Sequence, residues 1–142
     1  MIRHYTTLPN AARAIRTAVF MKEQGYLQEF DAIDACAVHF VAYEDNLPLG
    51  TCRLYRDAAT GDWHLGRLAV LPAARGRHLG QQLLAAAADY ARAQQARGIT
   101  LSAQAHAVPF YTRAGYRATG ERTLDEGHPH VTMHLTLTPM HS

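Results

Sequence analysis

The sequence predicts an α+β fold in which helices flank a mixed, mostly antiparallel central sheet. Two strand-like runs, residues 37–44 and 49–56, are separated by a short turn, which is typical of an antiparallel hairpin. Later, a long helical stretch lies between two further strand-like runs, which is typical of a β-α-β unit. The 142 residues suffice for one hydrophobic core, so we expect a single domain over residues 1–142.

The N-terminal part is expected to begin with a short strand over residues 1–6. A helix should follow Pro9, because Ile15 and Val19 recur at helical spacing. We expect Gly25 to end this helix, since glycine readily adopts the left-handed conformation found after a helix.

The hairpin and the strand after it are defined by turn residues. Asp45, Asn46 and Pro48 favour a turn between the two runs of the hairpin. The next run, WHLGRLAVL at residues 63–71, follows a second turn signal, TGD, and is expected to form a strand.

The clearest helix in the sequence begins at Leu79. Leu79, Leu83, Ala87 and Tyr90 lie on one stripe of that helix, which is typical of a helix packed on a core. We expect Gly98 to stop it.

The C-terminal part alternates strands with one short helix. Strands are expected at residues 99–103, 116–121 and 130–137, and a helix at residues 107–115. A right-handed crossover through the long helix would make the strand at 99–103 parallel to the one at 63–71.

Composition narrows the function and the location. Fourteen basic and 12 acidic residues give a net charge of only +2, which argues against sequence-independent nucleic-acid binding. No apolar run resembles a signal segment or a membrane span, so we expect a cytoplasmic protein without membrane contact. Cys36 and Cys52 lack metal-ligand spacing and are expected to be two buried thiols.

A glycine- and arginine-rich stretch, RLAVLPAARGRHLGQQLL, joins a strand to the long helix. The first amides of a helix lack partners and attract anions, and Gly76 and Gly80 allow close approach of a ligand. Arg75 and Arg77 add positive charge. By itself the stretch fits a phosphate cradle and a plain β-α turn equally well, and it is not a P-loop.

This stretch resembles the cofactor motif of the GNAT N-acetyltransferases, Arg/Gln-x-x-Gly-x-Gly/Ala. Arg75, Leu79 and Gly80 match the motif, whereas His78 stands where the first glycine is expected. We expect His78 to lie in a right-handed turn, where its amide can still serve the cradle and its imidazole is solvated or near phosphate.

A second segment, AQAHAVPFYTRAGY, resembles the family's Asn-x-x-Ala-x-x-Phe-Tyr-x-x-x-Gly-Phe motif. Phe110, Tyr111, Gly115 and Tyr116 match it, and Gln104 replaces the usual asparagine. The runs AVFMKEQG and EGHPHVTMHL are similar to a branch of small bacterial members of unassigned substrate.

The resemblance implies the acyl-CoA N-acyltransferase fold, with a parallel, splayed strand pair around the cofactor. It implies transfer of an acetyl group from acetyl-CoA, as cosubstrate, to a small-molecule or peptide amine, without a metal. The amides of residues 75–81 would hold the pyrophosphate, and the backbone near Leu68 and Val70 would pair with the pantetheine arm. The cofactor residues it implies are Leu68, Ala69, Val70, Arg75, Gly76, Arg77, His78, Leu79, Gly80, Gln81 and Gln104.

The resemblance also suggests catalytic groups. Tyr111 matches the general acid for the leaving thiolate, although a tyrosine packed in the core is the alternative. His106 is our candidate general base. The alternatives are His128, His130, Glu23, Glu29, Asp34 and a water chain. The acceptor is expected to meet Glu23, Gln24, His128 and His130.

Other interpretations are weaker. The scattered histidines lack the spacing of a zinc site, which disfavours a metallohydrolase. Arg53 and Arg67 lie in strands of alternating pattern, where they could face an anionic group of the substrate or the solvent, and we expect the solvent. The main rival is a non-catalytic sensor of coenzyme A or a nucleotide, and the chain is expected to be a monomer or a homodimer.

Overall fold

The computed structural model describes residues 1–138, and within them the chain forms two compact units. The first contains residues 1–55 and 65–87, and the second contains residues 56–64 and the chain from Ala88 onward. A single domain over residues 1–142 stays a prediction, and its last four residues lie outside the described part.

Four strands follow one another along the chain: β1 (Ile2–Tyr5), β2 (Val38–Glu44), β3 (Leu47–Arg56) and β4 (Trp63–Val70). They belong to the first unit, except for Arg56 of β3 and Trp63 and His64 of β4, which fall in the second. β2 is antiparallel to both β1 and β3. Asp45 and Asn46 have φ values of 51° and 67°, as a two-residue hairpin turn requires. The predicted hairpin is therefore confirmed, but Pro48 lies inside β3 rather than in the turn.

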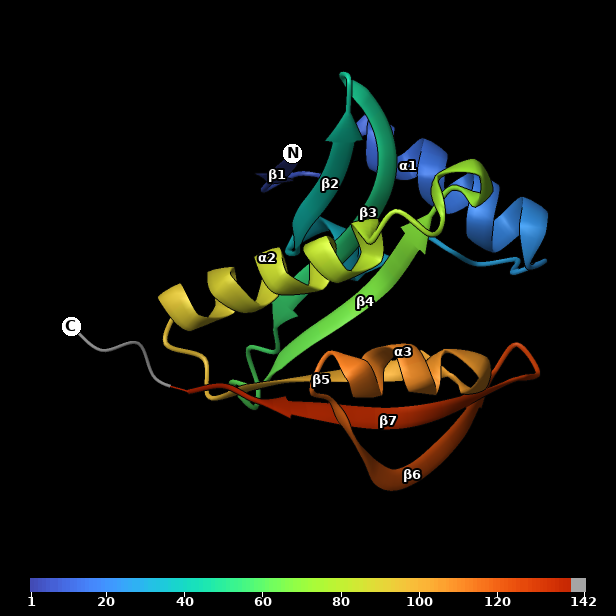
Figure 1. Ribbon diagram of the computed structural model, residues 1–142. Helices are drawn as coiled ribbons and strands as arrows, with labels where there is room; N and C mark the ends of the chain where they lie inside the picture. The colour runs from blue at the N-terminus through green and yellow to red at the C-terminus, as the bar shows by residue number, and fades with distance from the viewer. Residues whose placement is uncertain (139–142) are drawn as a thin grey trace. The chain divides into compact units, whose positions relative to one another are not determined.

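The helical part of this unit starts at Asn10, directly after Pro9 (Figure 1). Helix α1 (Asn10–Arg16) continues into a π-helical segment, η1 (Thr17–Glu23), and Gly25 follows with a φ of 79°. The predicted end of the helix is thus confirmed. One buried hydrophobic cluster of the unit consists of Ala12, Ile15, Val19, Phe20, Tyr26, Val41 and Ala69.

Helix α2 (Leu79–Ala93) begins in the first unit and ends in the second. Its predicted stripe is buried at Leu79, Leu83 and Ala87. Gly98 does not stop the helix, contrary to our prediction, because the left-handed residue after Ala93 is Gln95, with a φ of 64°.

Gly98 instead opens strand β5 (Gly98–Gln104) in the second unit. A Cβ atom at this position would lie 2.6 Å from the ring of His134, so the close packing of β7 explains the glycine. Its role was misread because sequence cannot distinguish a glycine that ends a helix from one that a neighbouring strand approaches closely.

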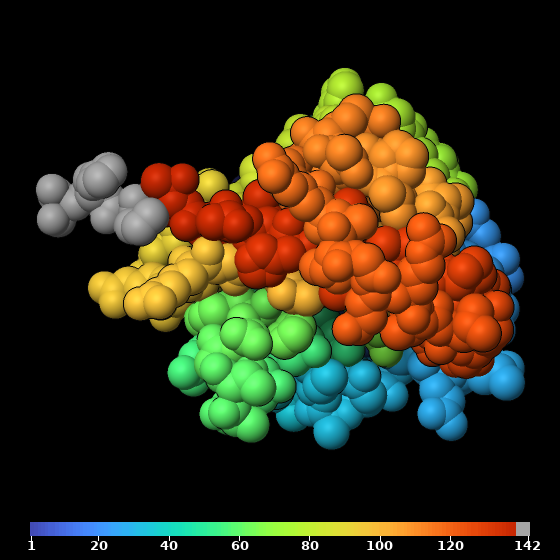
Figure 2. Space-filling view, turned by 90° about the horizontal axis from the view of Figure 1, so that it is seen from below, coloured from blue at the N-terminus to red at the C-terminus, as the bar shows by residue number. Residues whose placement is uncertain are grey.

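The second unit contains a three-stranded antiparallel sheet. β7 (His128–Thr136) lies between β5 and β6 (Arg117–Asp125), as Figure 1 shows. The short helix α3 (Val108–Arg113) follows the single turn η4 (Ala105–Ala107). Every residue of β6 is exposed. Figure 2 shows the hairpin of β6 and β7 at the molecular surface.

All strands and helices predicted from the sequence are present. Within residues 1–138, no helix is both long and apolar enough to span a membrane.

Candidate functional site

The loop between β4 and α2 has the backbone that an anion site needs. It contains the turn η3 (Pro72–Ala74), and the amides of Leu79, Gly80 and Gln81 stand in the first turn of α2. No carbonyl of a preceding helical turn is available to these amides. They therefore combine free donor capacity with the positive end of the helix dipole.

Two residues of this loop have left-handed backbone: Gly76, with a φ of 85°, and His78, with a φ of 64°. Our prediction of a right-handed turn at His78 is therefore wrong. The position uses the freedom that a glycine would supply, and histidine is one of the side chains found there more often than most.

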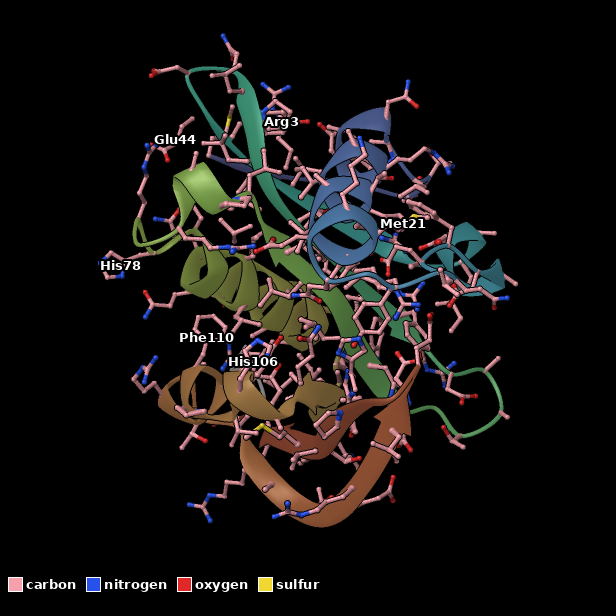
Figure 3. The ribbon with its side chains drawn as sticks, turned by 90° about the vertical axis from the view of Figure 1, so that its right-hand side faces the viewer. Arg3, Met21, Glu44, His78, His106 and Phe110 are labelled. Carbon is pink, nitrogen blue, oxygen red and sulfur yellow. The ribbon has the colours of Figure 1, made fainter. Side chains whose placement is uncertain are left out.

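The imidazole of His78 is exposed, and Nδ1 donates to Oε1 of Gln81 over 2.6 Å. Figure 3 shows the His78 side chain projecting outward from the loop. This bond spans the junction between the loop and α2, so the side chain helps to fix the backbone around the amides.

Arg75 is held by a carboxylate of the first unit. Its two terminal nitrogens donate to Glu23 over 2.8 and 2.6 Å, and its Nε donates to the carbonyl of Val70 over 3.0 Å. The hydrogen bonds from Arg75 lower the pKa of Glu23, and the same contact raises the pKa of Arg75. Glu23, predicted as an acceptor contact, therefore ties the cofactor loop to η1.

Arg77 is also near a glutamate. Its Nη1 lies 3.5 Å from an oxygen of Glu44, and both side chains are about half exposed. The two arginines predicted to add charge for an anion thus already have carboxylate partners at the surface.

The strand before the loop has an irregularity that sequence reasoning missed. Arg67 lies inside β4 with a φ of 55°, a left-handed residue that interrupts the regular pleat. Ala69 is buried, whereas Leu68 and Val70, predicted to pair with the pantetheine arm, are partly exposed.

Three arginines and three carboxylates form an ion-pair network in the first unit. Arg16, 1% exposed, contacts Glu29 over 2.9 Å and Asp34 over 2.7 Å. Arg53, 4% exposed, also contacts Asp34, over 3.0 Å. The remaining contacts are Arg53–Asp31 at 2.7 Å, Arg67–Glu29 at 3.0 Å and Arg67–Asp31 at 3.4 Å.

This network corrects the expectation that Arg53 and Arg67 face the solvent. Alternation along a strand shows which residues share a face, but it does not show that carboxylates cover that face. One local signal was available: Asp31 and Asp34 have the spacing of a capping box, and they form one around the short turn η2 (Ala32–Ala35).

The network also decides which carboxylates can accept a proton. Burial opposes ionisation of Asp34, but the hydrogen bonds and charges of Arg16 and Arg53 outweigh it and lower the pKa to about 2. Burial raises the pKa of Glu29, against the charges of Arg67 and Arg16. Asp34 is therefore too acidic to serve as the general base.

Tyr111 lies among aromatic rings of the second unit. It is 9% exposed, and its ring centroid is 5.2 Å from that of Phe110 and 5.9 Å from that of Tyr116. These contacts fix the orientation of the ring. Its role as general acid stays a prediction.

The other predicted residues of this unit fall into two groups. His106 is exposed in η4, on the same side of the short helical segment as Phe110 (Figure 3). Gln104 pairs with His130 across β5 and β7. His130 is buried, and its Nδ1 donates to the carbonyl of His128 over 2.9 Å.

The two cysteines differ in exposure. Cys52 is buried, and burial raises the pKa of its thiol, but Cys36 is exposed, so the prediction of two buried thiols is half wrong. No group of three His, Cys, Asp or Glu side chains within residues 1–138 is placed to hold a metal ion.

Comparisons with known proteins identify the family of this chain. The family model of the acetyltransferase (GNAT) domain matches residues 10–137. The uncharacterized N-acetyltransferase YjcF of Bacillus subtilis is 35% identical over 122 residues, which cover 84% of this chain and 86% of that protein.

Solved structures show the same fold over nearly the whole chain. An acyl-CoA N-acyltransferase from Pseudomonas aeruginosa is 31% identical with a TM-score of 0.82, covering 96% of this chain and 97% of that one. Escherichia coli ElaA is 26% identical with a TM-score of 0.83, covering 95% and 99%. These matches confirm the predicted fold class, an α+β fold with a mixed, mostly antiparallel sheet flanked by helices; the splay of the strand pair stays a prediction.

Proposed function

The chain belongs to the GNAT acetyltransferase family, and on that premise we propose that it transfers an acetyl group from acetyl-CoA to a primary amine. Transfer of an acyl group from an acyl-CoA is the activity that the family and its solved acyltransferase relative support. The acetyl group and the amine are the specific parts of our proposal.

The observation that carries the proposal is the loop–helix junction at residues 75–81. Its left-handed residues turn the chain into α2, so that the first amides of the helix stand together. A pyrophosphate is a doubly charged anion with several acceptor oxygens, which suits such a group of donors. Gly76 and Gly80 keep side chains away from this backbone.

The pantetheine arm would use the backbone of Leu68 to Val70. An extended arm with two amide groups can pair with a strand in the way that a peptide does. The left-handed residue Arg67 supports this assignment, because it breaks the regular pleat directly before the segment.

In the proposed reaction, the amine attacks the thioester carbonyl and forms a carbon–nitrogen bond. The carbon–sulfur bond then breaks, and Tyr111 donates a proton to the leaving thiolate. The amine proton passes to His106, directly or through water. His106 suits this role because its side chain is exposed and a neutral imidazole has a ring nitrogen that can accept a proton.

Two measurements test the proposal. Calorimetry should detect binding of acetyl-CoA, and mass spectrometry should detect N-acetylated product with at least one member of a panel of amines. Tyr111→Phe should lower kcat by about tenfold or more while leaving cofactor affinity within about twofold, since one proton donor contributes about 10²-fold or more. Tyr5→Phe, which removes another phenol, is the matched control.

Failure would take distinct forms. Absence of cofactor binding by the folded protein would exclude the cradle. Tight binding without turnover of any amine would favour the rival function, a non-catalytic sensor of coenzyme A.

A further inference from the structure

The ion-pair network has an enclosed end and an open end. The side chains of Arg16 and Glu29 are 1% and 3% exposed. Those of Arg67 and Asp31 are 25% and 39% exposed, and they lie 3.4 Å apart. The network therefore presents one cation and one anion to solvent, side by side and held from behind by buried charges.

Two donors at this end lack acceptors. Nε of Arg67 donates to the carbonyl of Glu29 and Nη2 to Asp31, but Nη1 has no hydrogen-bond partner within residues 1–138. Nε of Arg53 is buried and also has none. A buried donor without an acceptor is costly, so its persistence points to a group that is satisfied only when a ligand binds.

Gly66 leaves room beside these donors. A Cβ atom built on it would meet a single atom within 4 Å, the Nε of Arg53 at 4.0 Å. Any side chain at this position would stand against the unpartnered nitrogen. Gly66 thus places no side-chain atom against the Nε of Arg53, and Arg67 follows it in the chain.

The net charge of the network favours a zwitterionic ligand, which carries one positive and one negative charge. Three arginines and three carboxylates balance. An amine without a second group would add one positive charge beside Arg67, whereas a zwitterion leaves the balance unchanged. Since like charges in partly buried positions repel strongly, the zwitterion is favoured.

The position of Arg67 in β4 is where the acceptor amine would have to bind, if the proposed function holds. With the pyrophosphate at residues 75–81, the pantetheine arm runs from Val70 toward Leu68. Each strand residue advances the chain by about 3.3 Å, so the thioester end lies close to the residue before Leu68. That residue is Arg67.

We propose that the acceptor is a free α-amino acid, bound through its carboxylate by Arg67 and Arg53 and through its ammonium group by Asp31. Standard bond lengths place the nitrogen of an α-amino acid about 2.5 Å from its carboxylate carbon. Two such adjacent charges match the neighbouring Arg67 and Asp31. Amino sugars and polyamines carry no carboxylate for Arg67, and a peptide N-terminus carries none next to its amine.

The experiment compares amines that differ only in the carboxylate: alanine with ethylamine, and phenylalanine with phenethylamine. Product is measured by mass spectrometry, because the exposed thiol of Cys36 would react with thiol-detecting dyes. For the wild-type protein, the ratio of kcat/KM for the amino acid to that for the amine should be about tenfold or more, as expected for one charge-assisted contact.

Arg67→Gln should lower this ratio to about one, and Arg67→Lys should restore part of it. Both kcat/KM values in the ratio are proportional to the fraction of folded, active protein. A partly misfolded variant therefore gives the same ratio as a fully folded one. Gly66→Ala gives a second variant, which should raise KM for the amino acids several-fold. Arg3→Gln removes an exposed arginine elsewhere in the first unit and should keep the wild-type ratio.

A wild-type ratio near one, or a ratio that Arg67→Gln leaves unchanged, would overturn the inference while the proposed function stands. A peptide acetylated at its N-terminus more efficiently than any free amino acid would also overturn it. If the wild-type protein acetylates no amine at all, the proposed function fails and this inference fails with it.

Discussion

Two regions of the first unit use the same chemistry in different surroundings. In the cofactor loop, Arg75 pairs with Glu23 while both side chains are well exposed. In the network, Arg16 pairs with Glu29 and Asp34 while all three are buried. An exposed pair can exchange its partner for water or for a phosphate at little cost, whereas a buried pair cannot.

The loop can therefore rearrange when an anion binds, whereas the buried end of the network holds its side chains in fixed positions. The loop can release Arg75 toward an incoming anion because water screens the charges left behind. The network must keep its geometry, because any uncompensated charge would be stranded out of water.

Removing the central arginine of the network should have the largest effect. Arg16→Met leaves two buried carboxylates without their partner and should lower the free energy of unfolding by about 3–5 kcal/mol. Arg75→Met, the matched change in the loop, should lower it by less than about 1 kcal/mol. Urea unfolding measures both; equal losses would show that burial does not separate the two regions.

The loop should be sensitive to added negative charge. Gly80→Glu places a carboxylate among the amides at the start of α2 and should weaken acetyl-CoA binding at least about thirtyfold, or about 2 kcal/mol. Gly80→Gln, similar in size but neutral, should weaken it less. Calorimetry on the folded variants measures both affinities, and unchanged binding by Gly80→Glu would remove the cradle from this loop.

Acid should weaken the network through Asp34. Its pKa of about 2 in the folded protein lies below the ordinary value of 3.8, so the folded state favours the ionised form. The stabilisation is present above the unfolded pKa and is lost as the pH falls through the folded pKa, from about pH 5 to about pH 2.

The shift corresponds to about 2 kcal/mol, which urea unfolding across this pH range should reveal. Asp34→Asn should remove that part of the pH dependence. A curve for Asp34→Asn parallel to that of the wild type would assign the acid sensitivity to other groups.

The smallest effect concerns the backbone of the loop. The free energy of unfolding of His78→Gly should exceed that of His78→Ala by about 1 kcal/mol, because a residue with a Cβ atom is destabilised by about that amount in the left-handed conformation. At Arg77, where φ is not positive, the order should reverse. Unfolding of the four variants tests this, and the same order at both positions would contradict the left-handed backbone at His78.

Local signals in the sequence predicted the elements well. Turn residues located the hairpin at Asp45 and Asn46, helical spacing located α2, and glycine and arginine marked the cofactor loop. These features depend on a few neighbouring residues, so the sequence contains the information that specifies them. The resemblance to the GNAT family, carried by two short motifs, then supplied the fold.

The sequence by itself therefore determined the order of strands and helices, the fold class and the family. Only the tertiary structure decided that Arg16, Arg53 and Arg67 converge on Glu29, Asp31 and Asp34, that Arg75 is held by Glu23, and that His78 takes the left-handed conformation of the missing glycine. Partners separated by 13 to 52 residues meet only because the strands and helices pack, and no local pattern specifies such a meeting.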